Sequence, residues 1–145
     1  MSSKVTEGKR HRRGWRNALG QQLEDHTTIQ AFLFEQLHNA TQEVLAVLLL
    51  DKAYRVLHFY QIRKADLRTI TAYPREAIKR ALDYKAYAVV LARSCSFQNP
   101  RFDQMEIKLT QALKNLLALV DVHVIDHVLV TQDACVSLAE GGRLK

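Results

Sequence analysis

A buried strand, a polar loop and a long helix follow one another within residues 87–120, and this stretch constrains the fold more than any other part of the chain. The continuous apolar run at residues 87–92 predicts a buried strand, and apolar residues with a 3.6-residue period from Gln104 onward predict a helix. In α/β folds the end of such a strand lies beside the free N–H groups of the next helix, where ligands and catalytic groups gather. Function is therefore sought first in the loop at residues 93–103.

The remaining periodicity predicts further strands and helices on both sides of this stretch. Residues 44–50 are continuously apolar, as in a strand buried on both faces, and residues 55–64 alternate like a second strand. One helix is predicted from Thr28, with Thr27 or Thr28 as its N-cap, and another from Pro74, because proline suits a first turn. Strands at residues 122–130 and 135–138 complete an α/β pattern.

The length and composition fit one domain with its own hydrophobic core. The chain has 145 residues, of which 48% are hydrophobic, and no apolar run is long enough to span a membrane. The basic N-terminus lacks the apolar segment of a secretory signal peptide. The two cysteines, Cys95 and Cys135, have neither disulfide-framework nor zinc-ribbon spacing. We therefore expect a cytoplasmic protein.

Most of the excess positive charge lies at the N-terminus. Residues 1–16 hold six basic residues and one glutamate, so they carry +5 of the formal net charge of +6. Their low apolar content predicts that residues 1–26 form a disordered tail ahead of a domain at residues 27–145. Such a tail is either simply solvated or binds nucleic acid weakly and in a salt-sensitive way. The residues for that contact are Lys9, Arg10, Arg12, Arg13 and Arg16 together with Trp15, which could instead bury against the domain.

Several short phrases resemble, in their order and spacing, the JAB/MPN (JAMM) metallopeptidase domain, in particular the branch at the C-terminus of bacterial RadC proteins. The phrases span most of residues 28–144: Gln42-Glu43-Val44 leading into Leu48-Leu49-Leu50-Asp51, Tyr73-Pro74-Arg75-Glu76 with Lys79-Arg80-Ala81-Leu82, Val89-Val90-Leu91-Ala92, Leu109-Thr110, Leu113-Lys114, Asp126-His127-Val128-Leu129-Val130 and Val136-Ser137. The resemblance implies a three-layer, cytidine-deaminase-like α/β fold, in which helices flank a mixed, mostly antiparallel sheet.

Active members of this family bind a catalytic zinc through a loop like the one at residues 93–103. Their pattern is His-x-His-Pro-Ser-Gly-Asp-Pro, followed by a serine and, three residues later, an aspartate; some relatives cleave isopeptide bonds to ubiquitin-like modifiers. Pro100 aligns with the second proline. Arg93 and Cys95 then stand at the two zinc-binding histidines. Asp103 stands at the serine and Glu106 at the aspartate.

Arg93 is the decisive departure from the family pattern. A guanidinium has no lone pair to donate, stays protonated in proteins and repels a dication. We therefore predict that Arg93 fills the vacated metal cavity, with its charge balanced by Glu106 or Asp103. The latter two residues also match a capping box, which satisfies the first N–H groups of a helix without any metal.

The catalytic glutamate of the family is also predicted to be missing. In the family it lies on the second strand and acts as general base on a zinc-bound water. Counting back from Tyr73 places Tyr60 and Gln61 at this position, and neither side chain can serve as that base. His58 shares a predicted strand face with Tyr60 and is a candidate substitute, although a lone strand histidine is more often structural.

Other chemical interpretations stay open at this stage. A zinc site rebuilt from Cys95, Glu106 and His58 would make the protein a zinc-dependent hydrolase. Alternatively, Cys95 is a nucleophile activated by Arg93 and the helix N-terminus, although no base lies near it in sequence.

The Asp126-His127 pair also invites a catalytic interpretation. We favour a buried, hydrogen-bonded structural pair, because these residues lie within an apolar strand and belong to a core phrase of the family.

The function predicted from the sequence is that of a RadC-like JAB/MPN pseudoenzyme without metal or cofactor, which acts as a binding or scaffold module for an unidentified protein partner. Association with DNA through the basic tail is compatible with this role. RadC proteins usually carry a helix-hairpin-helix region before this domain, and we expect the preceding residues here to be too few for one. The alternative function is the zinc-dependent hydrolase with a rebuilt site.

Overall fold

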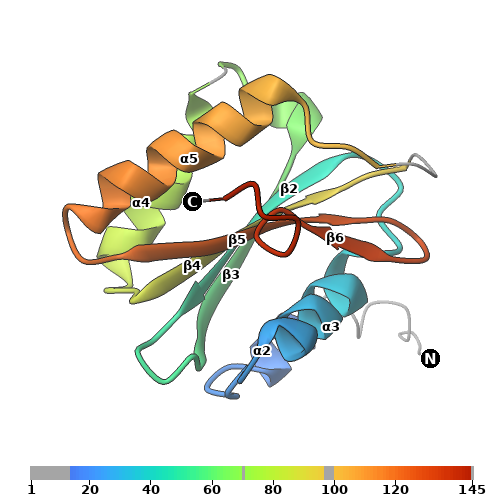
Figure 1. The fold of residues 1–145 in the computed structure, drawn as a ribbon. Helices are drawn as coiled ribbons and strands as arrows, with labels where there is room; N and C mark the ends of the chain where they lie inside the picture. The colour runs from blue at the N-terminus through green and yellow to red at the C-terminus, as the bar shows by residue number, and fades with distance from the viewer. Residues whose placement is uncertain (1–13, 70, 97–99, 145) are drawn as a thin grey trace.

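The computed structural model describes residues 14–69, 71–96 and 100–144, and within them five strands form one sheet in the order β3-β2-β4-β5-β6 (Figure 1). Within the described residues β4 and β5 are parallel, and the other neighbouring strands are antiparallel. In chain order the elements are α2 (Gly14–Asn17), α3 (His26–Leu37), β2 (Val44–Leu50), β3 (Val56–Arg63), η2 (Lys64–Asp66), α4 (Ala72–Asp83), β4 (Ala88–Ser94), α5 (Gln104–Ala118), β5 (His123–Val130) and β6 (Cys135–Ser137).

Helices cover both faces of the sheet, which confirms the predicted three-layer α/β fold (Figure 1). α3 packs on one face over a core that includes Leu33 and Leu48. α4 and α5 pack on the other face over a core that includes Leu49 and Leu117. β2 and β4 lie in the middle of the sheet and are buried on both faces, which explains their continuous apolar sequences.

The connection from β4 to β5 positions the loop that the sequence singled out. Because α5 is the crossover between these two parallel strands, the end of β4 and the start of α5 lie at the same edge of the sheet. Asp103 is the N-cap of α5, and its carboxylate accepts a hydrogen bond from the N–H of Glu106 at 2.7 Å. The predicted succession of strand end, loop and helix start is therefore confirmed.

A β-bulge in β3 changes the faces on which part of this strand lies. His58 pairs with Leu49 and Val56 with Leu50, so Leu57 has no partner of its own in β2. As a result Val56 packs in the core under α3, whereas Leu57 packs in the core under α4 and α5. In an unbroken strand, simple alternation would place Leu57 on the same face as Phe59. Because of the bulge, Leu57 instead lies in the same core as Tyr60, and Val56 in the same core as Phe59.

The folded domain extends further toward the N-terminus than residue 27. Ala18 and Leu23 are buried in the core under α3, and Trp15 packs edge-on against His58 with ring centroids 5.2 Å apart. The prediction of disorder is therefore wrong for residues 14–26. Composition averaged over the tail concealed these few apolar side chains, which suffice to anchor a short segment. Residues 1–13, where the rest of the predicted tail falls, lie outside the described residues.

α3 begins earlier than predicted. Its N-cap is Asp25, whose carboxylate accepts a hydrogen bond from the N–H of Thr28 at 2.9 Å, so neither Thr27 nor Thr28 is the cap. In the ranges that the structure describes, no helix combines the length and the apolar character needed to cross a bilayer.

Leu23→Ala tests whether the segment before α3 belongs to the folded domain. Leu23 is 1% exposed, so its truncation leaves a cavity and should lower the free energy of unfolding by about 2–4 kcal/mol in urea denaturation. Leu19→Ala is the matched control, because Leu19 lies in the same segment but is 58% exposed. Its effect should stay below about 0.5 kcal/mol. A negligible effect of both substitutions would contradict the packing of this segment.

Candidate functional site

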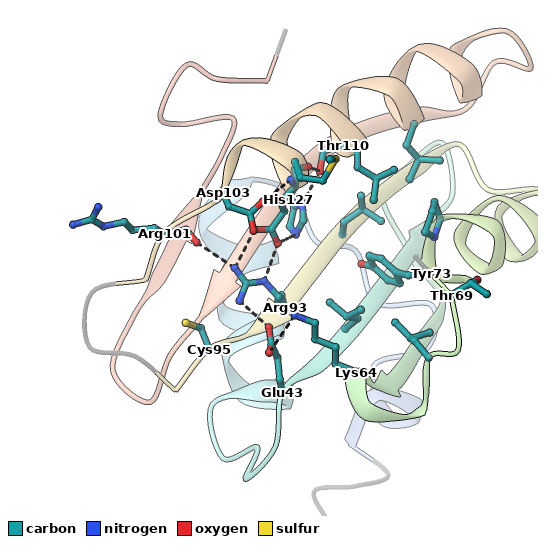
Figure 2. Close-up of a pocket in the computed structure, with 18 of the residues that line it drawn as sticks. Glu43, Lys64, Thr69, Tyr73, Arg93, Cys95, Arg101, Asp103, Thr110 and His127 are labelled. Atoms are coloured by element: carbon teal, nitrogen blue, oxygen red, sulfur yellow. Dashed lines mark hydrogen bonds and ion pairs between the residues drawn. The ribbon is translucent and has the colours of Figure 1, made fainter. Parts of the chain in front are cut away.

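Arg93, near the end of β4, lines a pocket of about 840 Å³ on the face of the sheet that carries α4 and α5 (Figure 2). One part of the lining is apolar and includes Leu45, Leu91, Leu109 and Leu113. Another part is charged and includes Glu43, Lys64, Arg68, Arg93, Arg101, Asp103 and Glu106. All four positions of the loop motif that the sequence singled out, Arg93, Cys95, Asp103 and Glu106, therefore meet in one pocket.

Two carboxylates hold the guanidinium of Arg93. Its Nε and Nη2 donate to the two carboxylate oxygens of Glu106 at 2.8 and 3.0 Å, and its Nη1 donates to Glu43 at 2.9 Å. Nη2 also donates to the backbone carbonyl of Arg101 at 3.2 Å (Figure 2). The side chains of Arg93 and Glu106 are only 13% and 15% exposed, which favours strong pairing in this two-pronged geometry. The predicted pair with Glu106 is confirmed, whereas Asp103 caps α5 instead.

The ion pairs reinforce the positive charge of Arg93. Burial by itself would lower the pKa of Arg93, but the hydrogen bonds and charges of Glu106 and Glu43 outweigh burial and raise that pKa above its ordinary value. Lys64 adds a second cation, with its Nζ 3.6 Å from the carboxylate of Glu43. Two cations therefore balance two carboxylates at this end of the pocket.

Glu43 is a site residue that the sequence did not reveal. Its phrase, Gln42-Glu43-Val44, served only as part of the family resemblance. The sheet brings it to Arg93 because β2 and β4 are neighbours, and Leu45 pairs directly with Arg93. Neither Tyr60 nor Gln61 lines the pocket. The carboxylate beside the motif positions is instead that of Glu43, which immediately precedes β2, whereas the family's glutamate was expected on β3.

The β3 residues that were considered for catalysis lie elsewhere. The ring of Tyr60 is covered by the guanidinium of Arg80, 3.5 Å from its centroid. His58 faces the same guanidinium, with its Nε2 2.9 Å from Nη1. His58 pairs with Leu49, four residues along β2 from the partner of Arg93, or about 13 Å at the rise of a strand. Burial, followed by the charge of Arg80, lowers the pKa of His58. His58 therefore cannot complete a metal site with Cys95 and Glu106.

His127 is a pocket residue that the sequence suggested to be merely structural. It is 2% exposed, its Nδ1 lies 2.8 Å from the hydroxyl of Thr110, and its Nε2 lies 3.4 Å from the carboxylate of Glu106. Among the described residues, this Nε2 is the one buried side-chain nitrogen or oxygen that has no hydrogen-bond partner. Burial, and then the charge of Arg93, lower the pKa of His127 to about 3. The ring is therefore neutral at pH 7, and its approach to Glu106 is not an ion pair.

Asp126 does not act together with the ring of His127. Its carboxylate accepts hydrogen bonds from the Ser137 hydroxyl at 2.5 Å and from the backbone N–H groups of Ala139 and His127 at 3.0 and 2.7 Å. Consecutive strand residues point to opposite faces, which separates the two side chains. Both are buried and hydrogen-bonded as predicted, but to different partners, so they form no catalytic dyad.

Comparison with known proteins agrees with the resemblance seen in the sequence. A family model described as the RadC-like JAB domain matches residues 23–143. The chain belongs to this family. It is similar to UPF0758 proteins of Acidovorax sp. (strain JS42), 43% identical over 88% of the chain, and of Methylibium petroleiphilum, 41% identical over 80%. A UPF0758 protein of Shewanella baltica (strain OS185) is 36% identical over 85%. The chain spans 56%, 52% and 55% of these three proteins, respectively.

The pocket of this RadC-like domain does not fit the zinc ion that active JAB/MPN relatives hold. The guanidinium of Arg93 pairs with the same Glu106 that stands at a zinc-ligand position, and a guanidinium offers no lone pair. Cys95 lines the pocket, but the described residues contain no group of three His, Cys, Asp or Glu side chains arranged to hold a metal. Within the same residues, the thiol of Cys95 has no hydrogen bond to a histidine or carboxylate base, as a thiol nucleophile would require.

The predicted nucleic-acid contacts are only partly within the described chain. Lys9, Arg10, Arg12 and Arg13 lie outside it. Trp15 packs on His58, and the guanidinium of Arg16 lies 4.7 Å from the centroid of the Trp15 ring. Trp15 therefore packs on the domain, which is one of the two alternatives predicted for it from the sequence.

Arg93→Ala should destabilise the domain by about 2–4 kcal/mol, because it leaves Glu106 and Glu43 without their main cation in a partly buried pocket. The free energy of unfolding of Arg93→Lys should lie between those of Arg93→Ala and the wild type, since an ammonium cannot pair in the two-pronged geometry. Arg55→Ala, which removes an exposed pair with Asp51, should cost less than about 1 kcal/mol. Urea denaturation measures all three, and equal costs for Arg93→Ala and Arg55→Ala would contradict the role of the pocket pair.

Acid should weaken the domain through His127. The folded-state pKa of about 3 lies below the ordinary value of 6.5, so the unfolded chain takes up this proton first. The stabilisation is complete above about pH 6.5 and is lost as the pH falls toward about 3, by at most about 1.4 kcal/mol per pH unit. His127→Gln should remove this part of the slope of unfolding free energy against pH. His123→Gln, at a side chain that is 44% exposed, should keep it, and equal slopes for the two variants would refute the assignment.

Proposed function

We propose that this RadC-like JAB domain is a metal-free binding module, a pseudoenzyme in which an internal ion pair replaces the catalytic zinc of active relatives. The observation that carries the proposal is that Glu106 and Glu43 accept three hydrogen bonds of 2.8 to 3.0 Å from the guanidinium of Arg93. The positive charge of Arg93 stands at a histidine position of the zinc motif. A metal ion and this guanidinium would compete for the same carboxylates and repel each other.

The same ion pair also argues against hydrolysis. A general base must be free to take a proton from water. Glu43, the carboxylate in a suitable place, accepts a hydrogen bond from Arg93 and lies 3.6 Å from the ammonium of Lys64, so its oxygens are already engaged by two cations. A rebuilt zinc site would need Cys95, Glu106 and a third donor, and His58 lies in another part of the domain. The hydrolase alternative therefore has less support than a binding role.

The pocket gives such a module a surface for recognition. It keeps a volume of about 840 Å³ next to the ion pair, within the range of ligand pockets. We propose a protein partner for this surface. The basic residues 1–16 add a possible salt-dependent contact to nucleic acid, which stays a prediction.

Metal analysis of the purified protein tests the proposal. Wild-type protein exposed to zinc and then desalted should retain far less than one equivalent. An Arg93→His/Cys95→His variant restores two imidazole ligands beside Glu106 and should retain about one equivalent of zinc, because three protein donors suffice for a tetrahedral site with water. His58→Gln in the double variant should leave the zinc content unchanged, as its side chain lies on another part of β3.

Two results would contradict the proposal. One is near-stoichiometric zinc in the wild type that is lost in a Cys95→Ala variant, which would favour the rebuilt hydrolase. The other is zinc in the double variant that depends on His58, which would place this residue at the pocket.

A further inference from the structure

We propose that the groove between α4 and α5 binds an extended peptide segment that carries acidic side chains beside apolar ones. This inference rests on the proposed binding function, since it names the class of partner that the pocket and its continuation would take. The two helices pack side by side on the same face of the sheet, and the pocket at Arg93 opens between their N-terminal halves (Figures 1 and 2).

The walls of this groove are apolar along both helices. On α4, Pro74, Ile78 and Leu82 follow at intervals of four residues and share one side of the helix. The opposite side of α4 faces β3, where Arg80 contacts Tyr60 and His58. The apolar side therefore faces α5.

On α5, Met105, Leu109 and Leu116 share the side that faces α4. Met105 and Leu109 line the pocket together with Tyr73 and Pro74 of α4. Leu116 lies seven residues, about two turns, beyond Leu109 on the same side of α5. The other flank of α5 carries Ile107, which packs against a separate cluster with Leu138.

The outer parts of these walls are left in contact with solvent. Leu82 is 49% exposed, Met105 62% and Leu116 51%. Single exposed apolar residues are ordinary, but apolar residues on the facing sides of two helices beside a pocket are typical of a site that another molecule covers. From Met105 to Leu116 the stripe extends about 17 Å along the helix, the length of about five residues of extended peptide.

The charges around the groove indicate the sign of the partner. The acidic residues of the pocket are already engaged: Glu43 and Glu106 by Arg93, and Asp103 by the first turn of α5. Arg68 and Arg101 line the same pocket, and their side chains form no ion pair within the described part of the chain. The positive charge left at the rim therefore complements carboxylates of a partner.

A buried polar atom adds an independent indication of a ligand. Nε2 of His127 lies in the pocket lining without a hydrogen-bond partner, although His127 is 2% exposed. A neutral imidazole nitrogen can hydrogen-bond to a peptide group or side chain that enters the pocket. Unpartnered buried polar atoms are rare, because each one costs free energy.

The lining favours a peptide over a nucleic acid. Single-stranded nucleic acids bind on exposed aromatic rings that stack with bases. The phenol ring among the pocket residues, that of Tyr73, is 7% exposed and its hydroxyl donates to the carbonyl of Ala46 at 2.6 Å, and the imidazole of His127 is also buried. Leucine and methionine walls instead suit the side chains of a peptide.

Selection from a random dodecapeptide display library on the full chain tests the inference. Enriched peptides should combine Asp or Glu with Leu, Ile, Val, Met or Phe, and binding of a synthetic enriched peptide should weaken as salt is added. Leu116→Asp and Arg101→Glu should each weaken that binding by roughly tenfold or more. Arg101→Glu should in turn improve binding of the same peptide with lysine in place of its acidic residues.

Leu19→Asp and Lys52→Glu are the matched controls. Leu19 is 58% exposed and lies next to α2. Lys52 is exposed in the turn that follows β2, so it lies at the other end of this strand from Glu43. Both variants should bind the peptide like the wild type, and circular dichroism should confirm that all four variants are folded. No enrichment, enrichment of basic or purely apolar peptides, or binding unaffected by both groove variants would overturn the inference. So would oligothymidylate binding that both groove variants abolish while peptide binding is absent.

The two proposals fail in different ways. Zinc retained by the wild type through Cys95 would refute the metal-free module, whatever peptides bind. A zinc-free protein that selects no acidic, apolar peptide would leave the metal-free module standing and refute this partner.

Discussion

The site depends on one constraint: the charge of Arg93 must be balanced where it is withdrawn from water. A buried cation without partners would cost several kcal/mol, and two carboxylates from separate elements meet this requirement. Glu106 lies in the first turn of α5, and Glu43 immediately precedes β2. The ion pairs therefore join α5 to β4 and to the segment immediately before β2.

The pair between Arg93 and Glu106 explains two further features of the pocket. A complete capping box at the start of α5 would turn the side chain of Glu106 back toward the N-terminus of the helix. Here the N–H of Glu106 receives its cap from Asp103, but the carboxylate of Glu106 is turned toward Arg93. The positive charge beside His127 then helps to keep its imidazole neutral. Arg93 thus affects the orientation of the Glu106 side chain, the charge balance of the pocket and the protonation of His127 together.

The fold was predictable because its central strands carry an unambiguous pattern. β2 and β4 are continuously apolar since helices cover both of their faces, and no other element of this length gives that pattern so directly. The errors occurred where local patterns are weak. A single bulge at Leu57 inverted the faces of part of β3. The few apolar residues of the N-terminal segment, among them Leu23, were hidden by the basic composition around them.

By itself, the sequence determined the layers of the fold, the loop that carries the site and the presence at a metal-ligand position of Arg93, which cannot bind metal. These follow from periodicity, from the chemistry of single side chains and, for the layers and the motif position of Arg93, from the resemblance to the JAB/MPN family. Only the tertiary structure decided which groups meet there. Glu43 and Arg93 are 50 residues apart in the chain, and their encounter follows from the pairing of β2 with β4. The orientation of His127 toward Glu106 likewise follows from packing against α5, which no local pattern encodes.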